Sequence, residues 1–378
     1  MEQGEALVEA QSNRPTTLRY VLIGCAAGIA LTHLRALAQM PEAQLVGMSD
    51  INAERGAARA AESGCPFFVD HRQLLKETRP DVAVIVTPHP FHAPLSLDCF
   101  AAGAHVLVEK PLAVEVAEAD HMIAAADEAG LILAVNFQQR FRPVIERARA
   151  LIDEGAIGPI VRTMCIEPWF RPAAYYRSAS WRGTWRGEGG GVLMNQAPHT
   201  MDLLCHLVGP PAKVWGWTRT LCHAMECEDT AQAMLEYPNG APGYFETSTV
   251  EAGMQARIHI VGDRGALELS GERLTVSRFE QPLREHMETS TEMFSAPPVH
   301  AETLTIPGDG GGHLAVYRDL HAAIVEGRRP RIDGREALMS LEMANAIILS
   351  SHTDRAVTLP LDRAAYSEVL EQLRATSR

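Results

Sequence analysis

Apolar runs and helix-like segments alternate through the first third of the chain, and this alternation restricts the fold more than any other feature. The apolar run at 18–23 (LRYVLI) is followed by a glycine-containing turn, a helical segment at 31–40 and a second apolar run at 44–48. The β-branched run at 81–86 is typical of a strand covered on both faces. Strands that alternate with helices predict an α/β fold with a doubly wound parallel sheet.

The same alternation continues to residue 136 and then gives way to a different pattern. Further helices are expected at 53–63, 71–78, 95–102 and 114–129, and further strands at 67–69, 105–108 and 131–135. After a helix at 141–154 and a strand at 160–167, six β-rich segments predict a mostly antiparallel sheet with one face covered by helices: 214–222, 231–237, 243–251, 257–262, 266–270 and 273–278. A long loop is expected at 281–312, followed by helices at 313–327 and 335–352 and a strand at 357–361.

We therefore predict three parts of the chain. Residues 1–16 are expected to be a disordered tail, 17–139 a dinucleotide-binding Rossmann domain, and 140–378 an α+β domain for substrate binding and oligomerisation.

Composition excludes several classes of partner. The 378 residues carry a formal net charge of −13, which argues against nucleic acid or an anionic membrane as a partner. No window approaches the ~20 apolar residues that a membrane-spanning helix needs. Seven scattered cysteines without a CxxC pair indicate free thiols in a reducing compartment, so we expect a cytoplasmic protein. Metal ligation by Cys222, His223 and Cys227 is a weak alternative to the expectation that no metal is bound.

The turn between the first strand and the first helix has the layout of a dinucleotide-binding unit. Its glycines allow the backbone to approach a pyrophosphate, and an acid, Asp50, follows the second strand at the distance expected for a contact to the adenosine ribose. This favours NAD, although nearby Arg55 keeps NADP possible. The alternative is a plain turn without a ligand. The expected cofactor contacts in the turn are Gly24, Ala26, Ala27, Gly28 and Ile29.

Other polar residues follow the remaining strands, where ligands of such sheets bind. The residues at these strand ends that are expected to contact the cofactor are Thr87, His89, His92, Glu109, Lys110 and Asn136. Pro111 biases Lys110 towards an extended backbone. We expect the lysine to hydrogen-bond the substrate oxygen and steady its alkoxide character, whereas a solvated strand cap is the alternative.

A second candidate stretch runs from residue 181 to 204 (WRGTWRGEGGGVLMNQAPHTMDLL). A flexible run, Gly189–Gly191, precedes Asn195, His199 and Asp202, whose spacing places them on one helical face. Pro198 fits the first turn of such a helix. The alternative is a loop followed by an amphipathic helix with solvated polar groups.

Aromatic residues and arginines are concentrated just before this stretch, between residues 169 and 186. Rings that stack on a sugar, with arginines that reach its hydroxyls, would suit a carbohydrate pocket, and Tyr175, Trp181 and Arg182 are the expected contacts. For any one of these residues, a structural loop or an oligomer contact is an equal alternative.

These motifs in this order resemble the glucose–fructose oxidoreductase, inositol dehydrogenase and rhizopine-catabolism (Gfo/Idh/MocA) family over about residues 18 to 360. The motifs are the Gly24–His33 turn, Asp50, Thr87–His92, Glu109-Lys110-Pro111, Arg140-Phe141-x-Pro143 and the glycine run with Asn195, His199 and Asp202. The resemblance implies an NAD(P)-dependent dehydrogenase of sugars, glycosides or cyclitols that forms homodimers or homotetramers through its antiparallel sheet. Many members carry an aspartate where this chain has Asn195.

The expected chemistry is hydride transfer between NAD and a ring hydroxyl. His199 is the expected general base or acid, and Lys110 the partner of the same oxygen. Asn195 is expected to orient the substrate or His199, and Asp202 to supply charge or to anchor its helix. Three alternatives remain: an NADPH-dependent keto-sugar or aldose reductase, a non-catalytic NAD-binding regulator, and an elimination or hydrolytic enzyme that uses NAD transiently.

Overall fold

A computed structural model describes residues 16–377, so the predicted tail at 1–16, apart from Thr16, lies outside the described residues. Internal contacts divide the chain into two units. Unit 1 contains the chain up to Ala113 together with 118–138 and 311–337, and unit 2 contains 114–117, 139–310 and the chain from Leu338 onward. The linear division of the chain at residue 139/140 stays a prediction.

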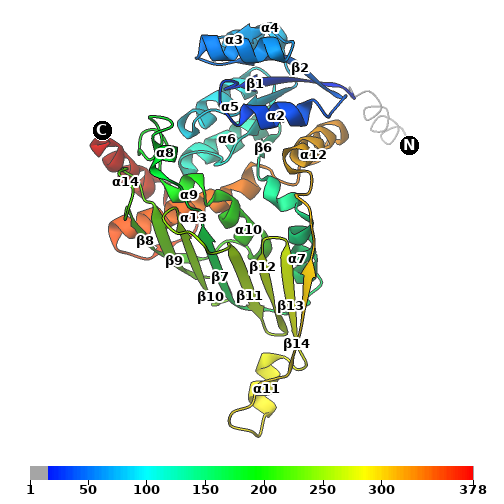
Figure 1. The fold of residues 1–378 in the computed structure, drawn as a ribbon, viewed down its shortest axis with the longest axis vertical. Helices are drawn as coiled ribbons and strands as arrows, with labels where there is room; N and C mark the ends of the chain where they lie inside the picture. The colour runs from blue at the N-terminus through cyan, green and yellow to red at the C-terminus, as the bar shows by residue number, and fades with distance from the viewer. Residues whose placement is uncertain (1–15, 378) are drawn as a thin grey trace. The chain divides into compact units, whose positions relative to one another are not determined.

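The sheet of unit 1 is parallel throughout and has the strand order β3-β2-β1-β4-β5-β6. Its strands are β1 (Leu18–Ile23), β2 (Ala43–Ser49), β3 (Phe67–Phe68), β4 (Val82–Ile85), β5 (His105–Val108) and β6 (Leu133–Val135). Figure 1 labels β1, β2 and β6 among these strands. Every residue of β4 is buried, as its continuous apolar run predicts. The order reverses between β1 and β4, so the carboxyl ends of these strands form the edge where such sheets bind ligands. The predicted doubly wound parallel sheet is confirmed.

Two helices of unit 1, α3 and α4, begin where short polar side chains cap them. Asn52 accepts a hydrogen bond from the backbone N–H of Arg55 at 3.0 Å, and Asp70 accepts one from that of Arg72 at 2.9 Å. The helices are α2 (Ala30–Leu37), α3 (Ala53–Glu62), α4 (His71–Thr78), η1 (His89–Phe91), α5 (His92–Ala101), α6 (Val116–Ala129, whose first two residues lie in unit 2) and α12 (Gly312–Glu326). Although α12 lies far along the chain, it packs against α2.

Unit 2 is built on a nine-stranded sheet of order β14-β13-β12-β11-β7-β10-β9-β8-β15. All its neighbouring strands are antiparallel except β7 and β10, which confirms the predicted mostly antiparallel sheet. The strands are β7 (Ile160–Pro168), β8 (Lys213–Arg219), β9 (Thr230–Glu236), β10 (Pro242–Ser248), β11 (Arg257–Gly262), β12 (Gly265–Ser270), β13 (Arg273–Phe279), β14 (Val299–Thr305) and β15 (Val357–Thr358).

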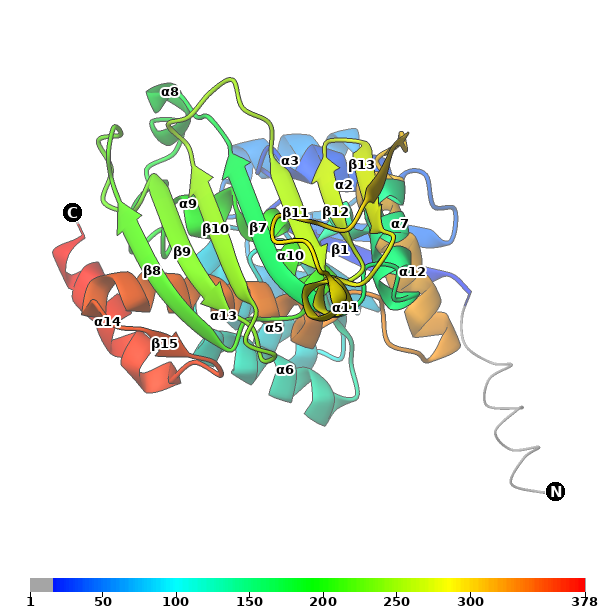
Figure 2. The same cartoon turned by 90° about the horizontal axis from the view of Figure 1, so that it is seen from below.

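One face of this sheet is covered by helices (Figure 2). Buried and less buried residues alternate along β7 and β11, as expected for strands with one covered face. At Gly216 on β8, a Cβ atom would lie 2.3 Å from the backbone oxygen of Ile347 in α13, so the helix lies directly against the strand. The helices that lie wholly or mainly in unit 2 are η2 (Gln138–Phe141), α7 (Pro143–Asp153), α8 (Ala173–Tyr176), α9 (Val192–Asn195), α10 (Pro198–Val208), α11 (Leu283–Thr289), α13 (Gly334–Thr353) and α14 (Arg363–Thr376).

The expected loop at 281–312 is wrong, because it contains α11 and β14. Six of the seven residues of β14 are exposed, so the strand shows no alternation that would reveal it and depends on its pairing with β13. Helix α11 has no buried residue. The final helix, α14, was not predicted; Asp362 caps its first turn by accepting from the N–H of Ala365 at 3.2 Å.

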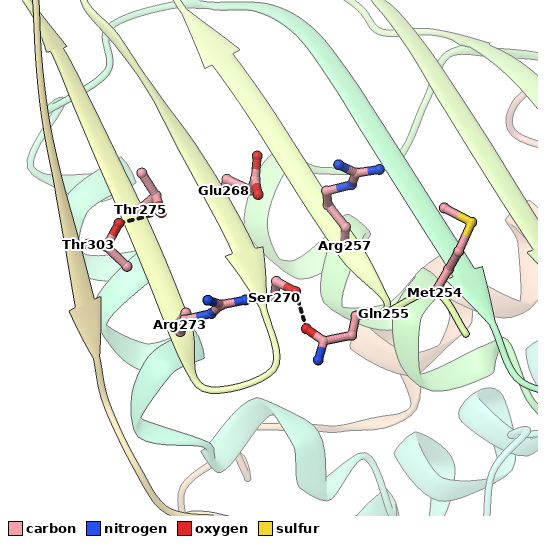
Figure 3. A pocket seen from close by; sticks show the side chains of 8 residues that line it. All are labelled: Met254, Gln255, Arg257, Glu268, Ser270, Arg273, Thr275 and Thr303. Atoms are coloured by element: carbon pink, nitrogen blue, oxygen red, sulfur yellow. Dashed lines mark hydrogen bonds between the residues drawn. The ribbon is translucent and has the colours of Figure 1, made fainter. Parts of the chain in front are cut away.

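The other face of the sheet carries exposed apolar residues and a pocket of about 370 Å³. The pocket is lined from β11 to β14 by side chains such as those of Arg257, Glu268 and Arg273, and it includes none of the residues predicted to bind cofactor or substrate (Figure 3). Trp215, Trp217 and Met234 are exposed on β8 and β9. A homodimer or homotetramer and a cytoplasmic location stay predictions. Among the described residues, no helix is long and apolar enough to span a bilayer.

Candidate active site

The turn after β1 brings the backbone close to the end of β4. Gly24 has a φ of +96°, and a Cβ atom there would lie 2.9 Å from the Cγ2 atom of Thr87, so a side chain is excluded. At Gly28 a Cβ atom would meet nothing within 4 Å. Gly28 and Ile29 are exposed and Ala27 is half-buried at the start of α2, where a helix N-terminus favours a phosphate group.

Asp50 follows β2 and braces this turn. Its Oδ2 atom accepts a hydrogen bond from the backbone N–H of Ala26 at 2.8 Å, and its Oδ1 atom accepts one from that of Asn52 at 2.8 Å. The Arg55 guanidinium donates to the backbone oxygen of Ala26 at 2.8 Å. Because a carboxylate has about four acceptor positions, Asp50 retains capacity for ribose hydroxyls.

The loop after β4 is fixed by a buried histidine. Nδ1 of His92 lies 2.8 Å from the backbone oxygen of Pro111, and Nε2 lies 2.9 Å from that of Thr87. Burial lowers the pKa of His92, although the two carbonyl oxygens favour its charged form. His89 is also buried, with its ring centroid 5.8 Å from that of His92. His92 thus holds this loop next to Pro111, and a cofactor contact by either histidine stays a prediction.

Hydrogen-bond donors surround the carboxylate of Glu109 at the end of β5. Its Oε1 atom accepts from Nδ2 of Asn136 at 2.5 Å and lies 2.9 Å from Nε2 of His33. Its Oε2 atom accepts from the backbone N–H of Lys110 at 3.2 Å. Burial favours the neutral acid, but the neighbouring rings of His313 and His33, the latter hydrogen-bonded, outweigh it and hold the pKa of Glu109 well below its usual range. The carboxylate therefore fixes the backbone from which Lys110 projects.

The residues that complete this network were missed by the sequence reasoning. His313 Nε2 lies 3.6 Å from Glu109, and the Tyr317 hydroxyl lies 2.9 Å from Nδ1 of His33. Both come from α12, about 200 residues further along the chain, and no local pattern connects them to β5. His33, Glu109 and His313 place three potential metal ligands within 4.8 Å of one another. His33 and Asn136 already bond Oε1 of Glu109, so we interpret the three residues as a carboxylate stabilised by hydrogen bonds rather than as a metal site.

In unit 2, the glycine run is closely packed, which corrects the expectation of a flexible segment. Gly189 to Gly191 are all buried. A Cβ atom at Gly191 would lie 1.9 Å from the backbone oxygen of Glu228, and one at Gly189 would lie 2.2 Å from Cγ1 of Val114. Glycine is therefore required at these positions, because other segments of the chain pack too closely against the backbone to leave room for a side chain. This packing holds the turn that follows in a fixed position.

The three polar residues after the run do not share one helix as predicted. Asn195 ends α9, and Pro198 starts a new helix, α10, because proline has no N–H with which to continue the first. Asp202 is fully buried and forms a two-pronged ion pair with Arg140, at 2.7 and 2.8 Å. Asp202 thus anchors η2 to α10. Between Glu188 and Cys205, only Asn195 and His199 are not buried.

Two buried glutamates hold this turn, and neither was predicted. Glu188 accepts a hydrogen bond from Nδ2 of Asn195 through Oε1, and one from the backbone N–H of Gly183 at 2.6 Å through Oε2. Oε1 of Glu228 accepts from the N–H groups of Gly191 and Leu193 at 2.9 and 3.1 Å. Glu188 directly precedes the glycine run, which was the available signal. It places a carboxylate next to Asn195, where the chain lacks the aspartate common in the resembling family.

Burial raises the pKa of Glu228 to about 7, and this leads to a prediction about stability. An unfolded glutamate has a pKa of about 4.3, so between these values the folded state binds the extra proton. The free energy of unfolding should therefore fall as pH rises from about 4.5 to 7, by roughly 3 kcal/mol for this group, and then level off. Glu228→Gln should reduce this slope in urea unfolding curves, whereas the exposed Glu288→Gln should not. An unaltered slope in Glu228→Gln would contradict the assignment.

The three predicted sugar-binding residues lie together. The guanidinium of Arg182 lies 4.2 Å from the ring centroid of Tyr175 and 4.5 Å from that of Trp181. Its Nη1 atom donates to the Tyr175 hydroxyl at 2.5 Å. Of the residues in the weak metal alternative, His223 has other partners, because its ring nitrogens lie 3.2 Å from Asp229 and 2.8 Å from the backbone oxygen of Arg171. Cys222 is exposed and Cys227 is buried.

Two family models match the chain and together cover most of it. Residues 18–137 match an oxidoreductase family with an NAD-binding Rossmann fold, and residues 145–268 match the GFO/IDH/MocA C-terminal domain. The chain belongs to the Gfo/Idh/MocA oxidoreductase family. The WlbA dehydrogenase of Bordetella pertussis, solved with NADH and UDP-GlcNAcA, is 31% identical, with a TM-score of 0.80 over 92% of this chain and all of that one.

Curated relatives of this Gfo/Idh/MocA chain act on different substrates. D-apiose dehydrogenase of Paraburkholderia graminis is 26% identical over 93% of this chain and 92% of its own. Trans-1,2-dihydrobenzene-1,2-diol dehydrogenase of Mus musculus is 29% identical over 64% of this chain and 71% of its own. The comparisons thus establish an NAD-binding oxidoreductase and leave its substrate to be identified.

The residues of unit 1 fit NAD. Thr87 Oγ1 and Asn136 Oδ1 are buried and have no hydrogen-bond partner within the described chain, although buried polar atoms are normally paired. Both follow strands at the ligand-binding edge, β4 and β6. A bound dinucleotide would supply hydrogen-bond partners for these two atoms and for the carboxylate of Asp50. Gly24 would leave room for it, because this residue has no side chain.

Asp50→Ala is expected to weaken NAD binding roughly 10- to 100-fold, the usual effect of losing hydrogen bonds to a charged group. NADP binding should weaken less, because its 2′-phosphate gains no hydrogen bond from the carboxylate. Fluorescence titration of both reduced cofactors measures the effect, with the exposed Glu54→Ala as the control. Equal weakening of the two cofactors would refute the ribose contact.

Proposed function

We propose that this protein is an NAD-dependent dehydrogenase that oxidises a ring hydroxyl of a sugar, glycoside or cyclitol. The observation that carries the proposal is the isolation of Asn195 and His199 as the only half-exposed groups in an otherwise buried stretch. A titratable imidazole and an amide held in a closely packed turn are suited to binding an alcohol and exchanging its proton. The sugar substrates of the relatives support the same class.

In this mechanism, His199 takes up the proton that the hydroxyl must lose as its carbon is oxidised. Lys110 donates a hydrogen bond to the same oxygen and stabilises its alkoxide character. NAD held by the turn at Gly24 and by Asp50 would supply the redox chemistry as the hydride acceptor. Asn195, fixed by its hydrogen bond to Glu188, orients the substrate or His199. Reduction of a keto-sugar uses the same residues in reverse.

A keto-sugar or aldose reductase that uses NADPH is the second candidate. The 1,5-anhydro-D-fructose reductase of Ensifer adhaerens, 25% identical over 90% of this chain and 98% of its own, favours it. The carboxylate of Asp50 opposes it, because a negative charge at the ribose site repels a 2′-phosphate.

The deciding experiment measures absorbance of the reduced nicotinamide with purified protein, NAD and NADP, and a panel of free sugars, methyl glycosides and cyclitols. A rate with at least one panel member that depends on NAD supports the proposal. Activity only with NADPH and a keto-sugar would establish the reductase instead. Loss of a glycoside without net change in the cofactor would indicate an elimination or hydrolytic reaction, and no reaction with either cofactor would leave the regulator as the better description.

A further inference from the structure

The segment before the glycine run has an unusual charge. The 20 residues from Pro168 to Gly187 contain four arginines and no aspartate or glutamate, whereas the whole chain has 47 acidic and 34 basic residues. A local excess of positive charge in an acidic protein favours an anionic ligand.

Two of these arginines share one aromatic ring. The guanidinium of Arg171 lies 5.1 Å from the centroid of Tyr175, and that of Arg182 lies 4.2 Å from it. Trp169 and Trp181 extend the stack, at 5.3 Å from Arg171 and 4.5 Å from Arg182. Stacking orients a guanidinium and leaves its N–H groups in the plane of the group available for a planar acceptor.

Neither arginine has an acidic partner among the described residues. Elsewhere in unit 2, arginines pair with carboxylates, as Arg149 does with Asp153 at 2.7 Å and Arg363 with Glu342 at 2.6 Å. Within the described residues, the guanidinium of Arg171 donates to the backbone oxygen of Phe170, and Nε of Arg182 is buried without a hydrogen-bond partner. This orphaned donor is the second observation that points to a ligand.

The stack is connected to the turn that carries the proposed reaction. The Tyr175 hydroxyl accepts from Nη1 of Arg182 at 2.5 Å and from Nε2 of Gln196 at 3.3 Å. Gln196 is buried and lies between Asn195 and His199 in the chain, and its Oε1 atom has no hydrogen-bond partner in the described residues. An amide oxygen at this position is suited to accept from a hydroxyl of the same ligand.

We propose that Arg182, with Arg171, binds a carboxylate on the sugar substrate, so that the enzyme acts on acidic sugars such as uronic acids or their glycosides. This inference rests on the proposed function and specifies its substrate class. The side edge of a guanidinium matches the two oxygens of a carboxylate, which gives geometric selectivity in addition to charge.

Matched substrates test the proposal. D-glucuronate and D-glucose, and D-galacturonate and D-galactose, differ only in the carboxylate, and glucose 6-phosphate carries a different anion. The wild type should favour the uronates roughly 10- to 100-fold in kcat/KM, as expected for a charge-assisted hydrogen bond. Arg182→Gln should abolish most of this preference and Arg182→Lys part of it. The exposed Arg177→Gln, from the same segment, is the control that should keep the preference.

Calorimetric binding of the same sugars to the NADH-loaded protein provides a readout that does not need turnover. Uronate binding that weakens in Arg182→Gln but not in Arg177→Gln supports the carboxylate site even if no sugar is oxidised, and in that case the proposed function alone fails. Equal binding of acidic and neutral sugars by the wild type, or a stronger preference for glucose 6-phosphate, overturns the inference. Unchanged NADH binding and thermal midpoint in each variant show that the protein is folded.

Discussion

Lys110→Ala is expected to lower kcat by roughly 10²- to 10³-fold, the usual effect of removing a donor that stabilises developing negative charge on oxygen. Lys110 is half-buried at the end of β5, and its backbone N–H is held by Oε2 of Glu109 at 3.2 Å. Because Asn136 and His33 in turn hold Glu109, the lysine backbone is fixed before substrate binds. NAD affinity should remain nearly intact, since glycine-turn and Asp50 contacts do not depend on the lysine.

Single-turnover and steady-state rates with NAD and the best substrate measure this effect, and fluorescence titration measures cofactor affinity. The chain has three lysines, and Lys76, exposed on α4, provides the matched control variant Lys76→Ala. Partial rescue of Lys110→Ala by added ethylamine would separate a chemical role from a structural one. Undiminished turnover in Lys110→Ala would exclude the lysine from the reaction.

The first sheet could be predicted because its information is local. Most strands of unit 1, such as β4 and β5, are short runs of apolar residues that are largely buried, and each of these two is followed by a residue that interrupts the pattern. Parallel strands place their carboxyl ends at one edge, so Gly24, Asp50, Glu109 and Asn136 could be grouped without coordinates. The same logic fails for β14, whose residues are exposed and whose only structural signal is the strand with which it pairs.

The unpredicted parts of the site depend on long-range contacts. His313 and Tyr317 reach the β5 region through the packing of α12 on α2, and nothing in either segment encodes that neighbour. Asp202 looked like a site residue by spacing, but its carboxylate is buried against Arg140, 62 positions away. Glu188 was visible beside the glycine run, yet only the fold shows that it bonds Asn195. Motif spacing therefore singled out the candidate residues, while their partners could be identified only from the structure.

His199→Asn is expected to lower kcat/KM by roughly 10²- to 10⁴-fold and to remove the rise of the oxidation rate with pH, because an amide cannot accept the proton of the hydroxyl. The exposed His300→Asn on β14 is the control.

A second group requires its own variant. Glu167 on β7 is buried and accepts a hydrogen bond from the hydroxyl of Thr200, the residue after His199, and burial raises its pKa to about 7.

The imidazole of His199 and the carboxyl group of Glu167 are both able to exchange a proton, and the two variants distinguish which of them produces the pH dependence of the rate. If His199 is the base, Glu167→Gln retains the rise of kcat/KM with pH, with at most a shifted midpoint, whereas His199→Asn flattens it. The reverse pattern, a normal profile in His199→Asn and a flat one in Glu167→Gln, would transfer the pH dependence to Glu167 and Thr200. In that case the imidazole would bind substrate without exchanging its proton, and the proposed mechanism would be wrong at its central step.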